Sequence, residues 1–579
     1  MQIANSIFRA SFCLLLPFSA WTQQYTISTF AGTGEAGSSG DNGLATAAEL
    51  NGPVGLFVSG SKLYITDEGN QRIRLVSGGN ITTIVGDGGV GYVGDGGAAI
   101  HAQVNGPADV ALDNAGNLYI ADSGNSVIRM VTPDGTISTI AGYVCPINLT
   151  TGCGPGYAGD GGVATAALLN NPLGVAVDPY GNVYIADSNN NVIRKISNGN
   201  ISTLGSTLHF NLPSIIVLDQ YQNLYITDTG NNRIVRLAPS GAATVVAGNG
   251  QTGYSGDNGL ATEAELAFPA AVALDGLGNL YIADRTNDVI REVNTNGTIT
   301  TIAGTGEPGY SGEGMALNAE LNFPAGIAVN ASGNVYVADT GNNRIRLLQP
   351  PAPAISSNGV VNAASYATSV SPGSLASIFG ASFGTSTASA GSLPLPTALE
   401  NVSVSVNGRA APMFYVGAGQ INFQIPWETA VGNASIIVSL NGVASNTATV
   451  PVLAASPGLF LQSSGAAIVQ NSDYTLNQSS NPAAAGSAVI AYLTGSGPVS
   501  KTIADGVASP SSPLDRATST VTATLGTQTA TVLFAGLAPG LVGVLQVNVM
   551  VPAGLAAGSY PLTVTVAGQA SNSAPISVK

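Results

Sequence analysis

Two sets of carboxylates recur along the chain at spacings that suit either cation binding or acid–base chemistry. Members of the first set each end an apolar run and precede a turn: Asp67, Asp122, Asp187, Asp228, Asp284 and Asp339. An Asp beside turn residues accepts hydrogen bonds from backbone amides, so we expect these six to be structural. The second set lies in Gly-rich segments such as GYSGDNG: Asp41, Asp95, Asp160, Asp257 and Glu313. These carboxylates could coordinate Ca²⁺ with backbone carbonyls, or supply a pair for hydrolysis.

Arginines recur seven residues after the first set, in five of six copies: Arg74, Arg129, Arg194, Arg291 and Arg346. Val235 replaces the arginine in the fourth copy. The arginines either pair with the acidic segments or bridge neighbouring repeats. Alternatively, they ring the mouth of a channel and bind an anion. Together with the second carboxylate set they form the candidate ligand-binding residues.

The elements that carry these residues repeat six times. Each copy contains a hairpin pattern of the type LYIADSGNSVIRMV (118–131), preceded by a short apolar strand such as DVALD (109–113). A fourth strand such as ISTIAG (137–142) follows the first five hairpins, and the sixth runs instead into QPPAP. The missing strand is found as ISTFAG at 27–32. The repeats therefore predict an all-β, six-bladed propeller over 25–349, closed by its N-terminal strand.

Five of the connections between blades are long, and they carry the second carboxylate set. In a four-stranded blade these connections emerge on the same face as the turns between the second and third strands. We therefore expect one rim, where a ligand would meet the protein. The segments lack the dense Asp spacing of a dedicated calcium loop. We predict no cofactor and no metal, with a small helical segment packing on the rim.

Catalytic patterns are sparse. The chain has two histidines, His101 and His209, and no G-x-S-x-G elbow followed by a helix. A nucleophilic triad needs a base beside its Ser or Cys. We predict a protein that is not an enzyme. The alternative is a hydrolase or lyase that acts on extracellular glycan or peptide through rim carboxylates.

Residues 1–24 place Arg9 before an apolar run from about 10 to 20, the pattern of a secretory signal cleaved between 20 and 24. The run is too short to span a bilayer, so we expect an exported protein without an integral membrane span, extracellular, at the cell surface or periplasmic. Cys145 and Cys153 then remain, and in an oxidising compartment we expect them to form a disulfide. The alternative is two free thiols.

The composition changes after Gln349. Residues 350–355 form a Pro-rich linker, and the rest duplicates itself with a shift of 126 residues, since QINFQIP (420–426) matches QVNVMVP (546–552). Short alternating strands predict two tandem immunoglobulin-like sandwiches, at 356–455 and 456–579. Only nine charged residues lie in 350–579, whereas 25–349 carries the whole net charge of −15. This charge argues against nucleic acid as a partner.

The hairpin motifs over 25–349 resemble the NHL-repeat family, and the long loops resemble the NHL propellers of teneurin-type proteins. The segments SPGSLASIFG and FYVGAGQINFQIPWE resemble a C-terminal module of unassigned function in large exported proteins of soil Acidobacteria of the Solibacter type. The resemblance implies a propeller scaffold and does not fix an activity. The sequence therefore favours an exported, monomeric, non-catalytic recognition or scaffold protein whose partner is an extracellular protein or glycan, with the tail as a stalk or surface-attachment module.

Overall fold

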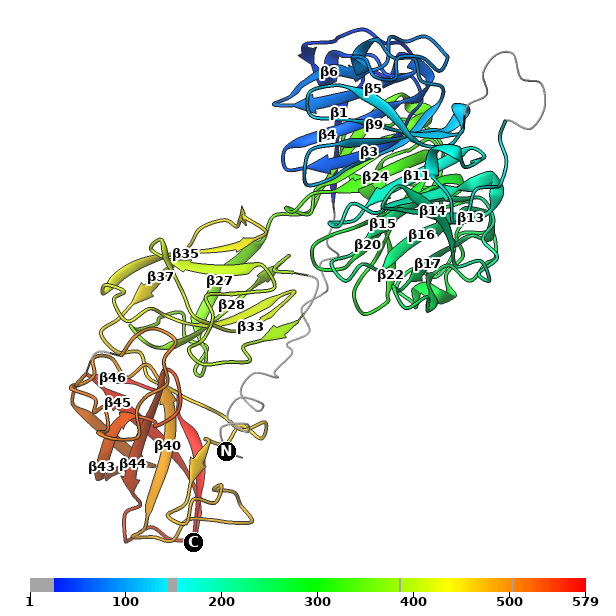
Figure 1. The fold of residues 1–579 in the computed structure, drawn as a ribbon. Helices are drawn as coiled ribbons and strands as arrows, with labels where there is room; N and C mark the ends of the chain where they lie inside the picture. The colour runs from blue at the N-terminus through cyan, green and yellow to red at the C-terminus, as the bar shows by residue number, and fades with distance from the viewer. Residues whose placement is uncertain (1–24, 144–153, 385–386, 502) are drawn as a thin grey trace. The chain divides into compact units, whose positions relative to one another are not determined.

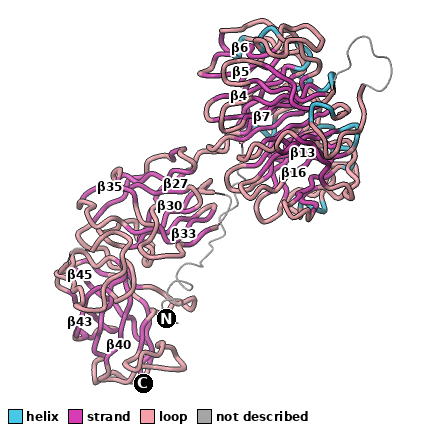
Figure 2. Tube along the Cα trace, viewed as in Figure 1, coloured by secondary structure: helices cyan, strands magenta, loops and turns pink. Residues whose placement is uncertain are grey.

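The computed structural model describes residues 25–143, 154–384, 387–501 and 503–579. The predicted signal segment and the predicted Cys145–Cys153 disulfide lie outside these ranges. The chain divides into two compact units, one over Gln24–Pro351 and one that contains Ala352–Lys579. Strands make up both units, with a few short helices in the first (Figure 2), so the all-β prediction is confirmed. Within the described ranges no helix is long and apolar enough to cross a membrane.

The first unit consists of six antiparallel sheets, or blades. Blade one contains β3 (Pro53–Ser59), β4 (Lys62–Asp67), β5 (Arg72–Ser77) and β6 (Asn80–Val85), and blade two contains β7 (Pro107–Leu112), β8 (Leu118–Asp122), β9 (Val127–Val131) and β10 (Ile137–Ala141). Blade three contains β11 (Pro172–Val177), β12 (Val183–Asp187), β13 (Val192–Ser197) and β14 (Asn200–Leu204), and blade four contains β15 (Pro213–Leu218), β16 (Leu224–Asp228), β17 (Arg233–Leu237) and β18 (Ala243–Ala247). Blade five contains β19 (Ala271–Leu274), β20 (Leu280–Asp284), β21 (Val289–Val293) and β22 (Ile299–Ala303).

The sixth blade joins the two ends of this unit. It contains β24 (Pro324–Val329), β25 (Val335–Asp339) and β26 (Arg344–Gln349), and its outer strand is β1 (Thr26–Ala31) from the N-terminal end. Ile27 lies opposite Leu348 in this pairing, as the sequence predicts for the segment 27–32. The first strands contact one another in the closed order β3, β7, β11, β15, β19, β24 and again β3. Of these strands, β3, β11, β15 and β24 are labelled in Figure 1. The unit is therefore a propeller ring, whose outermost strand in blade six is supplied by the start of the chain.

Each second strand is buried on both faces because neighbouring blades pack against it. In β8 all five residues are buried, which explains the nearly continuous apolar run LYIA in the sequence. The strand ends in a buried Asp, and a single 3-10 turn follows in every blade: η2 (Glu68–Asn70), η4 (Ser123–Asn125), η6 (Ser188–Asn190), η7 (Thr229–Asn231), η9 (Arg285–Asn287) and η11 (Thr340–Asn342).

The five long connections also contain a short helical turn, as predicted. These turns are η1 (Ala45–Ala47), η3 (Ala99–His101), η5 (Ala164–Ala166), η8 (Ala261–Glu263) and η10 (Ala316–Asn318). Their first alanines are buried, so each loop is anchored on its blade. Two of the loops add a two-residue strand beside an outer strand, β2 (Gly43–Leu44) on β6 and β23 (Gly314–Met315) on β1.

The second unit contains four antiparallel sheets in two pairs. The first pair joins β27 (Ala354–Asn362), β28 (Leu375–Ala381), β34 (Gln420–Gln424), β33 (Met413–Gly417) and β29 (Ala388–Ser389) to β30 (Ala398–Leu399), β31 (Val402–Val406), β32 (Arg409–Ala410), β35 (Gly432–Leu440), β36 (Val443–Ala444) and β37 (Ala448–Val452). The second pair joins β38 (Gly458–Leu459), β39 (Val469–Gln470), β40 (Ala488–Thr494), β44 (Val544–Met550) and β43 (Val532–Leu537) to β41 (Val521–Leu525), β42 (Gln528–Ala530), β45 (Gly558–Val566), β46 (Gln569–Ala570) and β47 (Ala574–Val578). Each pair encloses one apolar core, to which both of its sheets contribute.

The internal duplication of the tail is visible in its hydrogen bonds. Gln420 Nε2 donates to Asn422 Oδ1 at 2.9 Å, and Gln546 Nε2 donates to Asn548 Oδ1 at the same distance. These two pairs are related by the 126-residue shift found in the sequence. The repeated motif therefore supplies the same side-chain bond to the same strand of each copy.

Candidate functional site

The Asp that ends each second strand is a buried hydrogen-bond acceptor. In blade two, Asp122 is fully buried. Its carboxylate accepts hydrogen bonds from the backbone N–H of Asn105 at 2.7 Å, from Asn125 Nδ2 at 2.9 Å and from Arg129 Nη1 at 3.3 Å. Burial raises its pKa to about 6, although these donors act in the opposite direction. The same backbone bond recurs at the other hairpin carboxylates, Asp67, Asp187, Asp228, Asp284 and Asp339.

The recurring arginine lies between this carboxylate and the carboxylate of the long loop. Arg129 Nη2 contacts Asp95 Oδ1 at 2.6 Å, while Nη1 contacts Asp122. The Arg129 side chain is fully buried, and that of Asp95 is 37% exposed. Equivalent bridges to the loop join Arg74 to Asp41, Arg194 to Asp160 and Arg291 to Asp257, each at 2.8 Å. A guanidinium in this position ties the loop to its own blade.

A tyrosine from the same loop motif covers the guanidinium. The Tyr92 ring centre lies 4.9 Å from Arg129 Cζ, and its hydroxyl is 2.6 Å from Thr139 Oγ1 on the outer strand. Tyr157, Tyr254 and Tyr310 stack in the same way on Arg194, Arg291 and Arg346. Stacking on a desolvated cation is favourable, and the arginine Nε–H is buried without an acceptor in the described part of the chain.

These contacts leave the five arginines no exposed surface for a ligand. Of the predicted rim set, Asp41, Asp95, Asp160 and Asp257 each neutralise one arginine and keep 36–42% of the side chain exposed. Glu313 is arranged differently: its Oε1 accepts the Thr29 N–H at 3.2 Å, and Arg346 donates instead to the Gly312 carbonyl. The charged residues found from the sequence thus hold the loops in place.

Blade four departs from this arrangement because its connection is short. Val235 replaces the buried arginine. Arg233, two residues earlier, forms the ion pair with the Asp that ends the second strand, with Nε 2.7 Å from Asp228 Oδ2. The Arg233 side chain is 29% exposed. Arg233 was not among the predicted site residues, since the seven-residue spacing pointed to Val235.

One hydrogen bond latches each blade to the next. The residue after every 3-10 turn has a left-handed backbone conformation. Its side chain accepts a hydrogen bond from the backbone N–H of the residue that precedes the proline at the start of the next blade. In sequence order the acceptors are Gln71, Ser126, Asn191, Asn232, Asp288 and Asn343, and the N–H donors are Gly106, Asn171, Leu212, Phe268, Phe323 and Gly52. The last bond, from Gly52 to Asn343, closes the ring.

The six latch donors are all in the left-handed region. Gly and Asn adopt it at low cost, but a bulky residue there is an outlier. Leu212, Phe268 and Phe323 have φ of 48°, 46° and 49°, and they are 42%, 46% and 47% exposed. We call these three residues the apolar arc. Local sequence patterns do not predict the arc, because a residue before proline is ordinarily extended.

The inner strands of neighbouring blades approach one another closely. A Cβ on Gly174 would lie 2.1 Å from the Ser214 carbonyl oxygen of the next blade. Asp109 holds the same position in blade two, and its Oδ2 accepts the Val175 N–H at 3.0 Å. Burial raises the Asp109 pKa to about 7, and no cation pairs with it among the described residues.

Among the described residues, no group of three or more His, Cys, Asp or Glu side chains lies close enough to hold a metal ion. His101 belongs to η3 in the connection to blade two, and His209 to the short connection of blade four.

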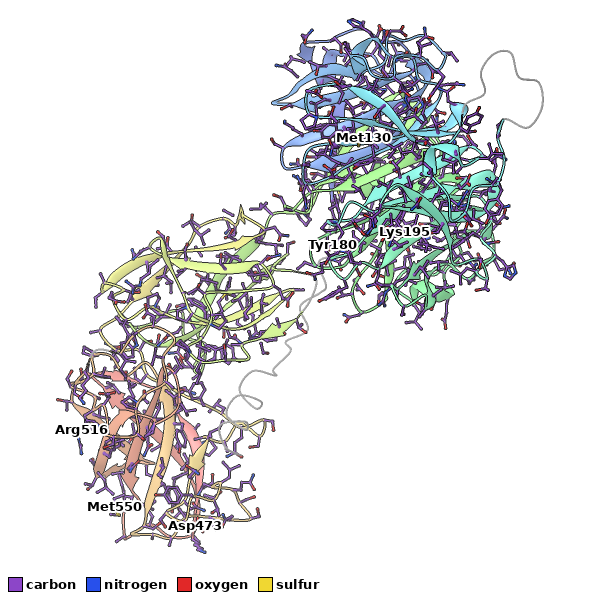
Figure 3. The ribbon with its side chains drawn as sticks, viewed as in Figure 1. Met130, Tyr180, Lys195, Asp473, Arg516 and Met550 are labelled. Carbon is purple, nitrogen blue, oxygen red and sulfur yellow. The ribbon has the colours of Figure 1, made fainter. Side chains whose placement is uncertain are left out.

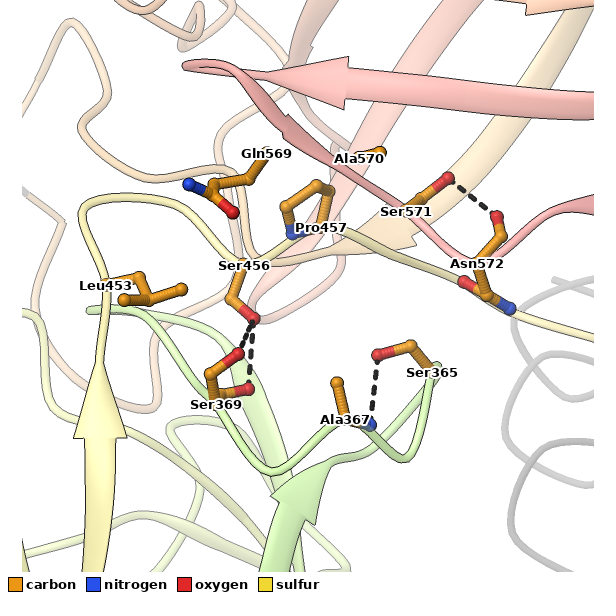
Figure 4. Close-up of a pocket in the computed structure, with 10 residues that line it drawn as sticks. All are labelled: Ser365, Ala367, Ser369, Leu453, Ser456, Pro457, Gln569, Ala570, Ser571 and Asn572. Atoms are coloured by element: carbon orange, nitrogen blue, oxygen red, sulfur yellow. Dashed lines mark hydrogen bonds between the residues drawn. The ribbon is translucent and has the colours of Figure 1, made fainter.

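The second unit contains a cavity of about 300 Å³ where its two sheet pairs meet. Figure 4 shows Ser365, Ser369, Ser456 and Ser571 along its wall, with Ser456 Oγ bonded to the Ser369 carbonyl at 2.9 Å. The unit carries no histidine, and no charged residue lines the cavity. A serine nucleophile there would have no imidazole base.

The bridged arginine generates the first prediction. Replacing Arg129 by Met leaves Asp122 buried and unpaired, so the propeller should lose roughly 3–5 kcal/mol. Arg72→Met is the matched control, because Arg72 is partly exposed and, among the described residues, its guanidinium donates only to the Asp87 carbonyl, at 3.2 Å. Urea unfolding of the full chain measures both. Adding Asp122→Asn to Arg129→Met should recover part of the loss, and equal effects of the two arginine variants would contradict the bridge.

Asp109 generates a pH prediction. Its folded-state pKa of about 7 lies above its unfolded value of 3.8, so the folded chain binds this proton more tightly. The protonated Asp109 therefore adds to the free energy of unfolding. This contribution is fully present below about pH 4 and is lost as the pH rises to about 7. Blades one and three have Gly55 and Gly174 at this position, so Asp109→Gly is the natural replacement. This variant should show a smaller fall in Tm between pH 5 and pH 8 than the wild type. Glu292, whose pKa is also raised to about 7 by burial, contributes equally to both proteins. Identical pH profiles would contradict the assignment.

Comparison with known proteins adds the family context. Residues 169–196 and 321–346 match the NHL repeat, and residues 215–308 match the teneurin NHL domain. Teneurin-3 of Danio rerio is 28% identical over 397 residues, which cover 60% of this chain but only 14% of the teneurin.

Solved structures with the same coverage are more distant. An auxiliary nutrient binding protein from Bacteroides thetaiotaomicron is 16% identical and covers 57% of this chain and 77% of its own, with a TM-score of 0.43. A streptogramin B lyase is 17% identical and covers 58% of this chain and 100% of its own, with a TM-score of 0.35. The sequence matches support a propeller built from NHL repeats.

Proposed function

We propose that the chain is an exported, non-catalytic recognition protein that binds an extracellular protein or glycan on the loop rim of its propeller. The tail then serves as a stalk or surface-attachment module of two immunoglobulin-like sandwiches. The apolar arc carries this proposal.

The arc places three bulky apolar side chains on neighbouring blades at the rim. The left-handed backbone costs an ordinary residue roughly 1–2 kcal/mol, and half of each side chain remains in water. Blades one to three have Gly52, Gly106 and Asn171 at the equivalent positions, so the fold does not require a bulky residue there. Strain kept at an exposed apolar surface points to contact with a ligand.

The charged residues of the rim support binding over catalysis. A general acid needs a raised pKa. The pKa of Asp160 is lowered instead, because hydrogen bonds from Thr203 and Arg194 outweigh the opposite effect of burial. Because each of four loop carboxylates pairs with the equivalent arginine of its own blade, none of the four stands out as a catalytic group. The alternative hypothesis is a hydrolase or lyase that uses one of these loop carboxylates.

Charge and sequence pattern support the remaining parts. The propeller segment 25–349 carries the net charge of −15, whereas 350–579 is close to neutral and rich in Ser, Thr and Gly, as suits an exported spacer. An acidic ring disfavours nucleic acid. The signal-like pattern in 1–24 supports export, and we expect the full chain to be a monomer.

The test replaces the arc by the residue of blade three. The triple variant Leu212→Asn, Phe268→Asn and Phe323→Asn should keep or gain stability, since Asn tolerates the left-handed region. Its binding to the glycans or displayed peptides that the wild-type full chain selects from an array should fall at least about tenfold, or 1.4 kcal/mol.

The matched control lies on the opposite face of the propeller. Tyr180, in the turn between β11 and β12 (Figure 3), is 83% exposed, and Tyr221 in the next blade is 72% exposed. The variants Tyr180→Asn and Tyr221→Asn should bind as the wild type does. Binding that survives in the arc variant would refute the proposal, and turnover abolished by replacing one loop Asp alone would favour the rival enzyme.

A further inference from the structure

The outer strand of blade four has an uncovered edge, whereas in each of the other five blades a long loop covers the equivalent edge. In five blades the long loop pairs with the outer strand, through Gly43 and Ile81, Ala98 and Thr136, Val163 and Asn200, Leu260 and Thr298, or Gly314 and Ile27. The connection to blade four, residues 206–212, is too short to reach β18. Within the described residues β18 pairs only with β17.

The uncovered edge presents backbone hydrogen-bonding groups. Ala238 N–H bonds to the Ala242 carbonyl at 2.8 Å, so the next pair, Leu237 and Ala243, is not hydrogen-bonded and the Ala243 N–H and C=O face outward. In blade five the equivalent Ile299 donates to Gly259 O at 3.0 Å and accepts from Asn258 N at 2.8 Å. In the described part of the chain Ala243 has no such partner.

A cavity lies where the loop would have packed. It measures about 480 Å³ and is lined by Leu208, His209, Asn231, Arg233, Val245 and Asn249 among others. Val245, 38% exposed, stands in the outer strand where four other blades have the threonine that bonds the loop tyrosine. The loop, the buried arginine and the threonine are thus replaced together in this one blade.

Arg233 gives the cavity its charge. Its Nε is fixed by Asp228, and Nη2 donates to the Leu208 carbonyl at 3.4 Å, while 29% of the side chain is exposed. A guanidinium anchored on one edge presents its other N–H groups to a carboxylate. In the covered blades the loop itself brings a carboxylate, Asp257 in blade five, to the arginine of the blade.

We propose that β18 and the Arg233 cavity bind an extended acidic peptide segment of a partner protein. The segment adds a fifth strand to blade four through the outward groups of Ala243, and an Asp side chain of the segment contacts Arg233. Four loops of the chain show that a Gly-Asp-Gly-Gly or Gly-Asp-Asn-Gly backbone fits beside an outer strand with its carboxylate on an arginine. Strand addition to an open edge is an established mode of peptide recognition. The site goes beyond the proposed function, because neither phenylalanine of the apolar arc belongs to it.

The experiment uses the full chain and a synthetic probe, the capped octapeptide GYSGDNGL copied from residues 253–260. Saturable binding is expected in fluorescence anisotropy. Replacing the peptide Asp by Asn, or Arg233 by Gln, should weaken it at least about tenfold. Arg72→Gln is the matched control, since Arg72 holds the same strand position in blade one, where the loop covers the edge, and this variant should bind like the wild type.

Backbone methylation of the peptide tests strand addition without altering the protein. In an antiparallel pair only alternate N–H groups face the neighbouring strand. Methylation should therefore abolish binding at alternate amides and leave it intact at the amides between them. Ala243→Pro should also abolish binding, because it removes the outward N–H and leaves the bonds to β17 in place.

Several results would overturn the proposal. They are no binding up to millimolar peptide, equal binding by all methylated peptides, binding that Arg233→Gln does not change, and displacement of the peptide by an oligogalacturonate that binds with higher affinity. Phe268→Asn with Phe323→Asn separates this site from the apolar arc: peptide binding should persist in that variant even where ligand binding at the arc is lost.

Discussion

The propeller depends on the positive charge of its recurring arginine, which is buried away from water and must be balanced by carboxylates inside the blade. A buried guanidinium is tolerated only when anionic partners replace its hydration, and Arg129 obtains two, Asp122 from its own hairpin and Asp95 from a loop 34 residues away. Because the loop carboxylate completes the set, the loop cannot leave its blade without exposing an unpaired charge. This requirement fixes four of the five long Gly-rich segments, and in the fifth Arg346 bonds the Gly312 carbonyl instead. Where Val235 replaces the arginine, the long loop is absent too.

Ring closure sets the second constraint. Six blades close only if the last meets the first, and β1 together with the bond from Gly52 to Asn343 makes that joint. Once the ring is closed, each latch holds its N–H donor in the left-handed region whatever the side chain of that donor. The surrounding contacts can therefore carry the strain of Phe268 and Phe323, which an isolated turn would relieve by changing its backbone. Closure thus makes it possible to present bulky side chains at positions suited to Gly or Asn.

The sequence was sufficient for the propeller because the repeats set the order of its strands. Six copies of the hairpin and the displaced strand at 27–32 predict the blades and their closure. The site was harder to predict, since Arg and Asp residues at constant spacing look alike whether they meet a ligand or each other. Their pairing follows from the path of the loop over its blade, which local pattern does not encode. Glu313 shows the limit: it shares the motif of Asp257 but bonds Thr29 instead of the arginine. The open edge of β18 likewise appears in sequence only as a missing loop.

Repetition also indicates where recognition can occur. A framework copied in five blades offers each side of the ring the same surface, so it cannot place one ligand in one orientation. The departures from the repeat are not spread evenly. Leu212, Phe268 and Phe323 belong to blades four, five and six, and the uncovered strand and the exposed Arg233 belong to blade four, whereas blades one to three keep Gly or Asn at the latch. The framework therefore supplies rigidity around the whole ring, and the features able to distinguish a partner are concentrated on half of it.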